Sequence, residues 1–204
     1  MFVGIVQGTA KVEELAAQPD FCRIGVRLPV SACTNLQQGA SIALNGVCLT
    51  ITSWQDNLVF FDVMQATLRL TNLGALQLGE VVNFERAARL QDEIGGHLMS
   101  GHIIDQVQLI KREELDTNNL RLQFSVAEQW HKYLFDKGFV GLNGCSLTVA
   151  ELTPAGFSVY LIPETRRATT FDSLPEGAWV NLEIDPQTQA IVATVERVLA
   201  SRGL

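Results

Sequence analysis

Two pairs of small polar residues stand where they could do chemistry, each on a predicted strand directly after an Asn-Gly dipeptide. The pairs are Cys48 with Thr50 and Ser146 with Thr148. Side chains alternate in direction along a strand, so both members of a pair point to one face. Their thiol and hydroxyl groups, with the open amides of a glycine turn, could form the rim of a small-molecule pocket. Polar decoration of a solvent face is the simpler interpretation of one such pair, but two pairs in one register weaken it.

Five further side chains are candidates for moving protons or binding charge, namely the three histidines, Lys137 and Asp185. His102, in the tripeptide Ser-Gly-His, is the obvious proton carrier near neutral pH, because an unperturbed imidazole has a pKa of about 6.5. A lone histidine after a glycine is more often an ordinary hydrogen-bonded residue, and His97 and His131 have less local support. Lys137 could bind an anionic or carbonyl group, although most lysines are solvated surface charges. Asp185 is expected first to cap the last helix.

Other classes of site find no support. No glycine-rich loop matches a phosphate-binding or dinucleotide-binding fingerprint. The four cysteines and three histidines have neither the spacing of a zinc site nor that of a redox pair, so we expect no metal. The net charge of -7 argues against a nucleic-acid partner, because such binding depends on clustered Lys and Arg.

The composition is that of a soluble globular protein, with 47% hydrophobic and 18% charged residues. No stretch resembles a membrane span, and the N-terminus lacks the basic and apolar regions of a signal peptide. We therefore expect a cytoplasmic protein that has no membrane partner. Structural disulfides are improbable in that compartment.

The chain nearly repeats itself, and this repeat must position the polar pairs. The ten residues IALNGVCLTI from Ile42 return as VGLNGCSLTV from Val140, and GEVVNFE from Gly79 aligns with GAWVNLE from Gly177. The period is far longer than a solenoid unit, so each copy is expected to be a complete small domain with its own core. Two homologous domains predict a pseudo-twofold pair.

The polar stretch 88–99, with its glycine pair at 95–96, marks the expected domain boundary. It divides the chain into a first domain of residues 1–96, a second domain of residues 97–186 and a C-terminal segment of residues 187–204.

Short apolar runs separated by turn residues predict an all-β fold of antiparallel barrels or sandwiches. The expected strands are 2–12, 22–28, 41–44, 48–52, 58–63 and 80–86 in the first copy, and 101–110, 120–125, 139–142, 146–150, 157–161 and 179–184 in the second. Each Asn-Gly predicts a type I′ hairpin, which needs two residues with positive φ. Short helices are expected at 67–73, 127–134 and 165–171.

A longer helix is expected from Pro186 onward, because proline suits the first helical turn. Its apolar residues form one stripe: Ile191, Val192, Val195, Val198 and Leu199. An apolar stripe of this kind needs a partner surface to cover it, and the sequence allows two. The helix either joins subunits in an oligomer or packs back onto its own barrel.

Over essentially its whole length, the sequence resembles the α subunits of riboflavin synthases, in the lumazine-binding domain family. The motifs that carry the resemblance are MFVGIVQGTAK, ALNGVCLT, FDVMQATLRLTNLG, EIGGHLMSGH, KGFVGLNGCSLT, LIPET and VNLEIDPQTQAIVATVERVL. The resemblance implies two homologous six-stranded antiparallel Greek-key barrels plus a C-terminal α-helix. It also implies a homotrimer held partly by that helix, and no metal or redox cofactor.

The reaction that the resemblance implies is a dismutation of two molecules of 6,7-dimethyl-8-ribityllumazine. They exchange a four-carbon unit and give riboflavin and 5-amino-6-ribitylaminopyrimidinedione. Two copies of one substrate would explain two copies of one domain. In the family the first barrel (N-barrel) of one subunit meets the second barrel (C-barrel) of its neighbour, with both rings between them. An association with lumazine synthase is left open.

Carried over residue by residue, the resemblance implies one substrate site on each barrel. The N-barrel site would use Gly4, Ile5, Val6, Cys48, Leu49, Thr50, Asp62, Val63, Met64, Gln65, Ala66 and Thr67. Phe2 would complete the wall of the pocket. The C-barrel site would use Gly101, His102, Ile103, Lys137, Ser146, Leu147, Thr148, Ile162, Pro163, Glu164, Thr165, Arg166 and Arg167.

The catalytic roles follow as hypotheses. His102, with Ser146 and Thr148, would remove a proton from the 7-methyl group of one lumazine on the C-barrel. Cys48, or a positioned water, would add to C7 of the other lumazine on the N-barrel. Asp185 would orient His102 or a hydroxyl group.

The sequence departs from the family pattern at several positions. Val3 stands in the opening motif where Thr is usual, and Ala66 replaces a usual Glu, which removes a carboxylate from the N-barrel site. The second copy keeps that carboxylate as Glu164 but has Arg166-Arg167 and Asp172 where other residues are usual. The polar pairs are intact, so a working enzyme is favoured.

Two alternatives differ in class. A non-catalytic lumazine or flavin carrier, like the antenna proteins of luminous bacteria, would have lost one site, whereas both copies here keep their polar pairs. A purely structural trimer would not explain why Cys, Ser and Thr recur together. Formation of riboflavin from the lumazine would separate an enzyme from a carrier.

Overall fold

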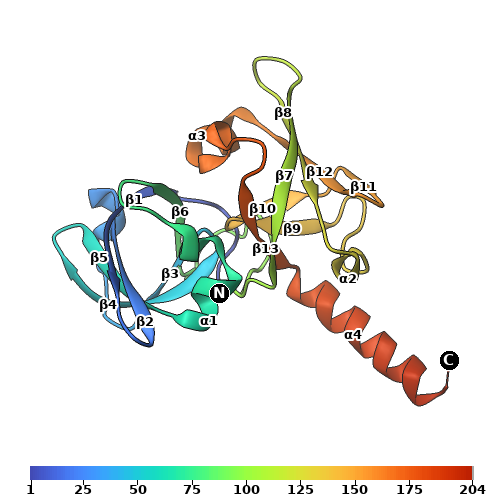
Figure 1. Ribbon diagram of the computed structural model, residues 1–204, viewed down its shortest axis with the longest axis horizontal. Helices are drawn as coiled ribbons and strands as arrows, with labels where there is room; N and C mark the ends of the chain where they lie inside the picture. Colours follow the sequence, from blue (N-terminus) through green and yellow to red (C-terminus); the bar gives the residue numbers. More distant parts are fainter. Residues whose placement is uncertain (204) are drawn as a thin grey trace.

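The structure is a computed structural model, and it describes residues 1–203. Figure 1 shows two β-domains side by side and a C-terminal helix that projects from the second domain. Across the described residues, no helix combines the length and apolar character needed to cross a membrane.

The first copy forms the expected closed six-stranded antiparallel barrel, in the order β1-β2-β5-β4-β3-β6. Its strands are β1 (Gly8–Ala17), β2 (Phe21–Arg27), β3 (Ser41–Leu44), β4 (Val47–Gln55), β5 (Leu58–Met64) and β6 (Val81–Arg86). The alternating side chains fill the interior, where residues such as Val12, Ile24, Ile42, Val59 and Phe61 are inaccessible to solvent.

The second copy repeats this order as a seven-stranded sheet, β10-β9-β13-β7-β8-β12-β11. Its strands are β7 (Asp105–Glu114), β8 (Leu120–Ser125), β9 (Phe139–Leu142), β10 (Cys145–Thr148), β11 (Glu151–Thr153), β12 (Gly156–Leu161) and β13 (Trp179–Ile184). The counterpart of β4 is divided into β10 and β11, so the second barrel is not continuously hydrogen-bonded. The division falls at Val149 and Ala150, near the position where β4 has a bulge between Ile51 and Ser53.

The predicted strand starts at residues 2 and 101 are wrong. Strands β1 and β7 begin only at Gly8 and Asp105, and the residues before them leave their own barrel. We call residues 1–7 and 98–104 the leading segments. The carbonyls of Gly4 and Gly101 accept from the opposite barrel, and Phe2 pairs with Met99 of the other leading segment, so these residues do not extend the strands.

The two Asn-Gly hairpins meet at the seam between the barrels. The φ angles are 44° and 80° at Asn45 and Gly46, and 43° and 80° at Asn143 and Gly144, which confirms the predicted positive values. A Cβ on Gly46 would lie 2.6 Å from the Gly144 nitrogen, so glycine is required by the close approach.

Buried asparagine side chains fasten these hairpins across the seam. Asn83 Nδ2 donates to the Asn143 carbonyl at 3.0 Å, and Asn181 Nδ2 donates to the Asn45 carbonyl at 2.9 Å. The two bonds are equivalents under the internal repeat. They confirm the expected pseudo-twofold relation and fix the barrels relative to each other.

The helices lie near the predicted positions. The short ones are α1 (Gln65–Leu70), α2 (Glu128–His131) and α3 (Pro163–Ala168), with 3-10 turns η1 (Val30–Cys33), η2 (Asn72–Ala75) and η3 (Thr170–Ser173). The last helix, α4 (Pro186–Ser201), begins as predicted, and Asp185 caps it by accepting from the amides of Gln187 and Thr188.

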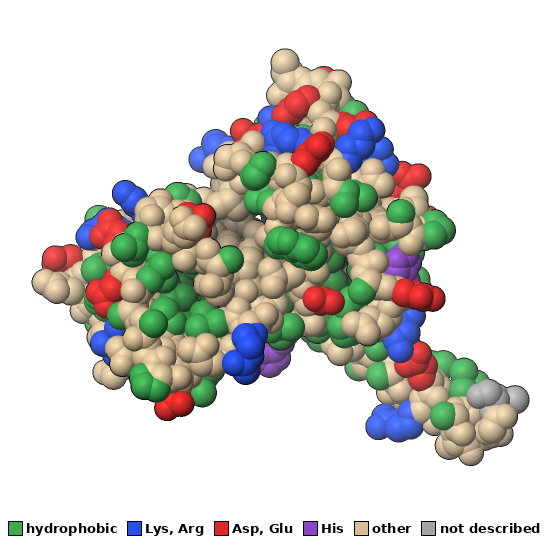
Figure 2. Space-filling model, viewed as in Figure 1, with side chains coloured by type: hydrophobic (Ala, Val, Ile, Leu, Met, Phe, Trp, Pro, Cys, Tyr) green, Lys and Arg blue, Asp and Glu red, His purple; other side chains and the backbone are tan. Residues whose placement is uncertain are grey.

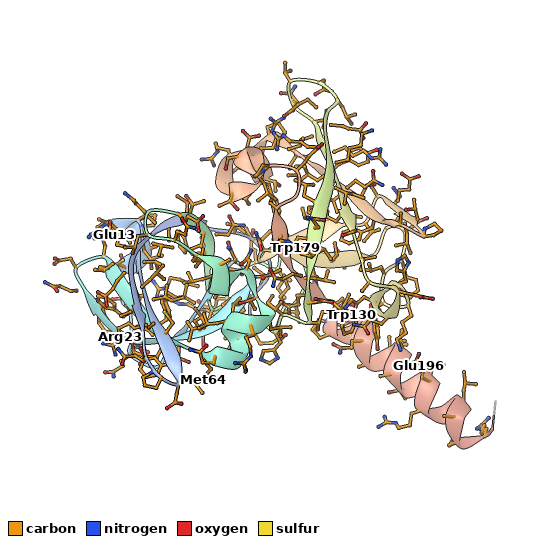
Figure 3. The ribbon with its side chains drawn as sticks, viewed as in Figure 1. Glu13, Arg23, Met64, Trp130, Trp179 and Glu196 are labelled. Atoms are coloured by element: carbon orange, nitrogen blue, oxygen red, sulfur yellow. The ribbon has the colours of Figure 1, made fainter. Side chains whose placement is uncertain are left out.

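Helix α4 does not pack back onto its own barrel. None of its residues is buried, and Figure 2 shows it standing clear of the rest of the molecule. Its apolar stripe is exposed, with Ile191 at 64% and Val195 at 51%. An ion pair between Lys132 and Glu196, which lies in the second half of α4 (labelled in Figure 3), links the helix to the second domain.

Candidate active site

The two barrels exchange their leading segments. Val6 precedes β1 but belongs to the hydrophobic core of the second barrel, whereas Ile103 precedes β7 but belongs to the core of the first. The segments cross where Phe2 and Met99 pair, with backbone N–H···O bonds of 2.8 and 2.9 Å in the two directions. Each barrel is therefore completed by residues from the other half of the chain.

On the N-barrel, this exchange encloses a pocket of about 250 Å³. Its lining combines β4, α1 and the second leading segment: Val47, Cys48, Ala66, Thr67, Leu70, Thr71, Gly101, His102 and Ile103. The Cys48 amide donates to the Gly101 carbonyl at 2.9 Å, which fixes the segment against β4. A thiol, a threonine hydroxyl and an exposed imidazole thus meet around one hollow.

The equivalent place on the C-barrel is built by Ser146 and the first leading segment. The Ser146 amide donates to the Gly4 carbonyl at 2.8 Å. Ser146 Oγ lies 2.6 Å from Nδ1 of His97, whose ring stacks on Phe139 at a centroid distance of 5.0 Å. Burial lowers the pKa of His97 below its usual value, against a smaller opposite effect of the Asp185 charge. His97 is therefore neutral at pH 7 and able to accept a proton.

His97 is the functional candidate that the sequence prediction undervalued. It is only 6% exposed, and its Nε2 atom is buried without a hydrogen-bond partner among the described residues. No spacing signal could have revealed its contact with Ser146, because the two residues lie in different structural elements. The contact depends on how the linker after residue 88 returns to the seam.

Glycine is required at the centre of both sites. Gly4 has a φ of 72°, and a Cβ there would lie 2.5 Å from Ser146 Cβ. Gly101 has a φ of 79°, and a Cβ there would lie 2.6 Å from Cys48 Cβ. Both positions therefore require glycine, because φ is positive and because the leading segment lies in close contact with the opposite strand.

The predicted grouping of the leading segments is wrong. The sequence-based assignment placed Gly4, Ile5 and Val6 with the N-barrel site and Gly101, His102 and Ile103 with the C-barrel site. The structure places 101–103 against Cys48 and 4–6 on the side of Ser146. The pairing of His102 with Ser146 and Thr148 consequently fails, because His102 faces the other pocket.

Several predicted residues have other partners. The Asp62 carboxylate accepts from Arg23 at 3.0 Å. Asp185 bonds to the start of α4 rather than to His102. Phe2 is 2% exposed and packs beneath Cys48 and Gly101, where it supports the pocket from inside.

The unusual arginines of the second copy form surface ion pairs. Arg166 binds Asp172 at 2.6 Å and Glu114 at 2.8 Å. Arg167 binds Glu164, the carboxylate that the first copy lacks. These contacts account for both arginines and for Asp172 without a substrate.

The remaining predicted residues line the outer rims. Thr50 and Thr148 are exposed, whereas the strand residues directly before them, Leu49 and Leu147, are buried. This is the alternation that the sequence predicts. Leu49, Val63 and Leu147 are buried beneath them, whereas Met64, Lys137, Ile162 and Pro163 are exposed. Gln65 and Thr165 are half-buried at α1 and α3.

A larger hollow of about 670 Å³ lies at the seam, and Trp179, labelled in Figure 3, is part of its lining. Its lining includes only Arg167 from the predicted sites and none of the thiol, imidazole or serine groups described above.

Comparison with known proteins decides the family. The lumazine binding domain family matches residues 3–87 and 100–185. Riboflavin synthase of Escherichia coli K12 is 53% identical over 203 residues, which cover 99% of this chain and 95% of that protein. The chain belongs to the riboflavin synthase family. Another relative in this family, riboflavin synthase of Chlamydia pneumoniae, is 40% identical and matches 100% of this chain and 99% of its own.

Solved structures agree on the fold. LumP complexed with riboflavin has a TM-score of 0.84, and LumP complexed with 6,7-dimethyl-8-(1'-D-ribityl) lumazine has one of 0.81. In both cases the identity is 23%, and the match covers 90% of this chain and 99% of the LumP chain. At that identity the likeness shows the two-barrel fold alone, so the site of this riboflavin synthase family member is argued from its own residues.

Proposed function

We propose that this protein is a riboflavin synthase. It converts two molecules of 6,7-dimethyl-8-ribityllumazine into riboflavin and 5-amino-6-ribitylaminopyrimidinedione by transfer of a four-carbon unit. The observation that carries the proposal is the pair of equivalent sites made by the exchanged segments, in a chain 53% identical to a riboflavin synthase over nearly its full length. Both donor and acceptor are the same compound, so two related sites suit the reaction.

The two sites differ in the groups that do chemistry. At the C-barrel site, the neutral His97 accepts a proton through Ser146, and this supports removal of a proton from the 7-methyl group of one lumazine. At the N-barrel site, Cys48 and His102 line one pocket, and this supports addition of a nucleophile at C7 of the other lumazine. The asymmetry makes one substrate a donor and the other an acceptor.

The active unit is a homotrimer in which the N-barrel of one subunit meets the C-barrel of its neighbour. The exposed stripe of α4 supports this, because an uncovered apolar helix face needs a partner. Exposed apolar side chains also surround both sites, namely Ile5, Met64, Phe139 and Ile162. Orienting two bound reactants contributes about 7 to 11 kcal/mol to the lowering of a barrier in favourable cases.

The compartment is the cytoplasm, where thiols stay reduced. All four cysteines are free, which supports this assignment. The domains are residues 1–96 and 97–186, followed by the C-terminal segment 187–204, which contains most of α4. The exchange of leading segments supports a linker that ends near His97.

Mixing the purified protein with 6,7-dimethyl-8-ribityllumazine tests the function. We expect riboflavin fluorescence to grow continuously, with two lumazines consumed for each riboflavin formed. A spectral shift of the lumazine at fixed stoichiometry, with no riboflavin produced, would instead make the protein a carrier. A Ser146→Ala variant, which removes the hydroxyl group that contacts His97, serves as the matched control.

A further inference from the structure

Two buried glutamates lie directly behind the two sites. Glu85 on β6 and Glu183 on β13 are equivalents in the motifs VNFE and VNLE, and their exposures are 3% and 1%. They lie two residues after Asn83 and Asn181, so they share the strand face that points to the seam. Neither forms an ion pair within residues 1–203, although burying an unpaired carboxylate is costly.

Both carboxylates bind the backbone of a leading segment instead. Glu85 accepts from the amides of Val3 at 2.7 Å and Gly4 at 3.1 Å. Glu183 accepts from the Ser100 amide at 2.6 Å, the Ser100 hydroxyl at 2.8 Å and the Gly101 amide at 3.1 Å. Hydrogen bonds from several N–H groups are the arrangement that stabilises a buried carboxylate.

Each glutamate holds a residue whose carbonyl reaches the other barrel. The Gly4 amide bonds to Glu85, and the Gly4 carbonyl accepts from Ser146. The Gly101 amide bonds to Glu183, and the Gly101 carbonyl accepts from Cys48. A chain of bonds therefore runs from each buried carboxylate, through one glycine, to the reactive strand of the opposite barrel.

We propose that Glu85 and Glu183 are positioning residues, one for each substrate site. Glu85 fixes the segment that completes the Ser146 site on the C-barrel, and Glu183 fixes the segment that completes the Cys48–His102 site on the N-barrel. The inference rests on the proposed function for the identity of the ligand. The positioning itself is a property of the free protein and is tested separately.

Glutamine is the informative substitution. Glu85 uses its two oxygens for two different amides, so Glu85→Gln keeps the size but puts an NH₂ group against a backbone N–H. Glu183→Gln has the same consequence at Ser100 and Gly101. Glu176→Gln is the matched control, because Glu176 also accepts from a backbone amide, that of Arg112 at 2.8 Å, but is exposed and away from both sites.

Amide hydrogen exchange, measured with and without riboflavin, reports both on the order of the leading segments and on ligand binding at the two sites. Without ligand, and at pH 8, above the Glu85 pKa of about 7, we expect exchange in residues 2–5 of Glu85→Gln, and in residues 99–102 of Glu183→Gln, to accelerate about 10- to 100-fold, as loss of a charge-assisted bond predicts. With riboflavin, Glu85→Gln should lose protection around Ser146 but keep it around Cys48, and Glu183→Gln should show the reverse. Glu176→Gln should behave as wild type.

A merely structural role would not produce this site-selective pattern. Equal loss of protection at both sites in each variant, or unchanged exchange of the leading segments, would overturn the proposal. If the wild-type protein showed no riboflavin protection at either site, the proposed function would fail, while exchange in the free variants would still decide the positioning. Thermal unfolding and circular dichroism establish that each variant is folded.

Discussion

Nδ1 of His97 lies 2.6 Å from Oγ of Ser146, although the two residues come from the linker and from β10. The imidazole is stacked on Phe139 and shielded from solvent, which keeps it neutral. This contact and the bond from Ser146 to Gly4 place a base, a hydroxyl and a leading segment at one point. The C-barrel site is therefore chemically distinct from the N-barrel site, which presents Cys48 and His102.

Replacing His97 tests its role as the base. His97→Gln should lower lumazine turnover about 10²-fold, the scale of a lost general base. Because burial lowers the pKa of His97, the wild-type rate should stay high below pH 6.5 and fall only as the pH drops through that lowered pKa. This acid limb should be missing in the variant. Stopped-flow measurement of riboflavin formation across the pH range provides the check.

His131→Gln is the control for that experiment. His131 lines a separate hollow with Glu128 and Pro154, so its replacement should leave the rate and the pH profile unchanged. A wild-type rate in His97→Gln would show that another group takes the proton.

The close contacts of Gly4 and Gly101 predict large effects of one added methyl group. Gly4→Ala and Gly101→Ala combine a disfavoured positive φ with a collision near 2.5 Å, so each should lower the free energy of unfolding by about 2 to 5 kcal/mol. Urea unfolding measures this loss.

Gly39→Ala separates the cost of the positive φ from the cost of the steric collision. Gly39 has a φ of 84°, but a Cβ there would have no atom within 4 Å, so its substitution carries the backbone cost alone, about 1 kcal/mol. Equal losses in all three variants would mean that the contact with the opposite strand contributes nothing.

The internal repeat predicts the barrels and the Asn-Gly hairpins, and Pro186 with the apolar stripe predicts the last helix, because each has a local signal. The exchange of leading segments has none. Val6 and Ile103 are apolar residues just before a strand, and periodicity reads them as its first residues. Only tertiary packing places them in the opposite core. The glutamates of VNFE and VNLE did leave a signal, since both copies keep a charged residue at a buried strand position.

The buried carboxylate of Glu85 predicts a pH-dependent stability. Burial and the nearby Glu183 charge raise its pKa to about 7, while the amides of Val3 and Gly4 and the N-terminal amine oppose the shift. The native protein therefore keeps a proton that the unfolded chain releases above pH 4.5. The associated stability is full below pH 4.5 and is lost as the pH rises through 7, by about 3 kcal/mol at most.

Unfolding free energies of the wild type and of Glu85→Gln, measured between pH 4 and 8, check this slope. The stability of the wild type relative to Glu85→Gln should decrease as the pH rises over that interval, because glutamine does not titrate. A constant difference would show that Glu85 has an ordinary pKa.

The exposed stripe of α4 predicts that subunit association can be broken without unfolding a barrel. Val195→Lys should turn trimers into monomers in sedimentation velocity and abolish turnover, while thermal unfolding of each barrel is retained, because α4 buries none of its residues in its own chain. Ala193→Lys, on the opposite side of the same helix, should leave the trimer intact. A Val195→Lys trimer with full activity would remove α4 from the interface.

The central claim is that one chain carries two exchanged sites for two molecules of one substrate. The most direct measurement is the stoichiometry of the reaction with 6,7-dimethyl-8-ribityllumazine, followed by riboflavin fluorescence and lumazine absorbance together. The account predicts one riboflavin and one pyrimidinedione for every two lumazines consumed. Saturable binding of lumazine without riboflavin formation would contradict it.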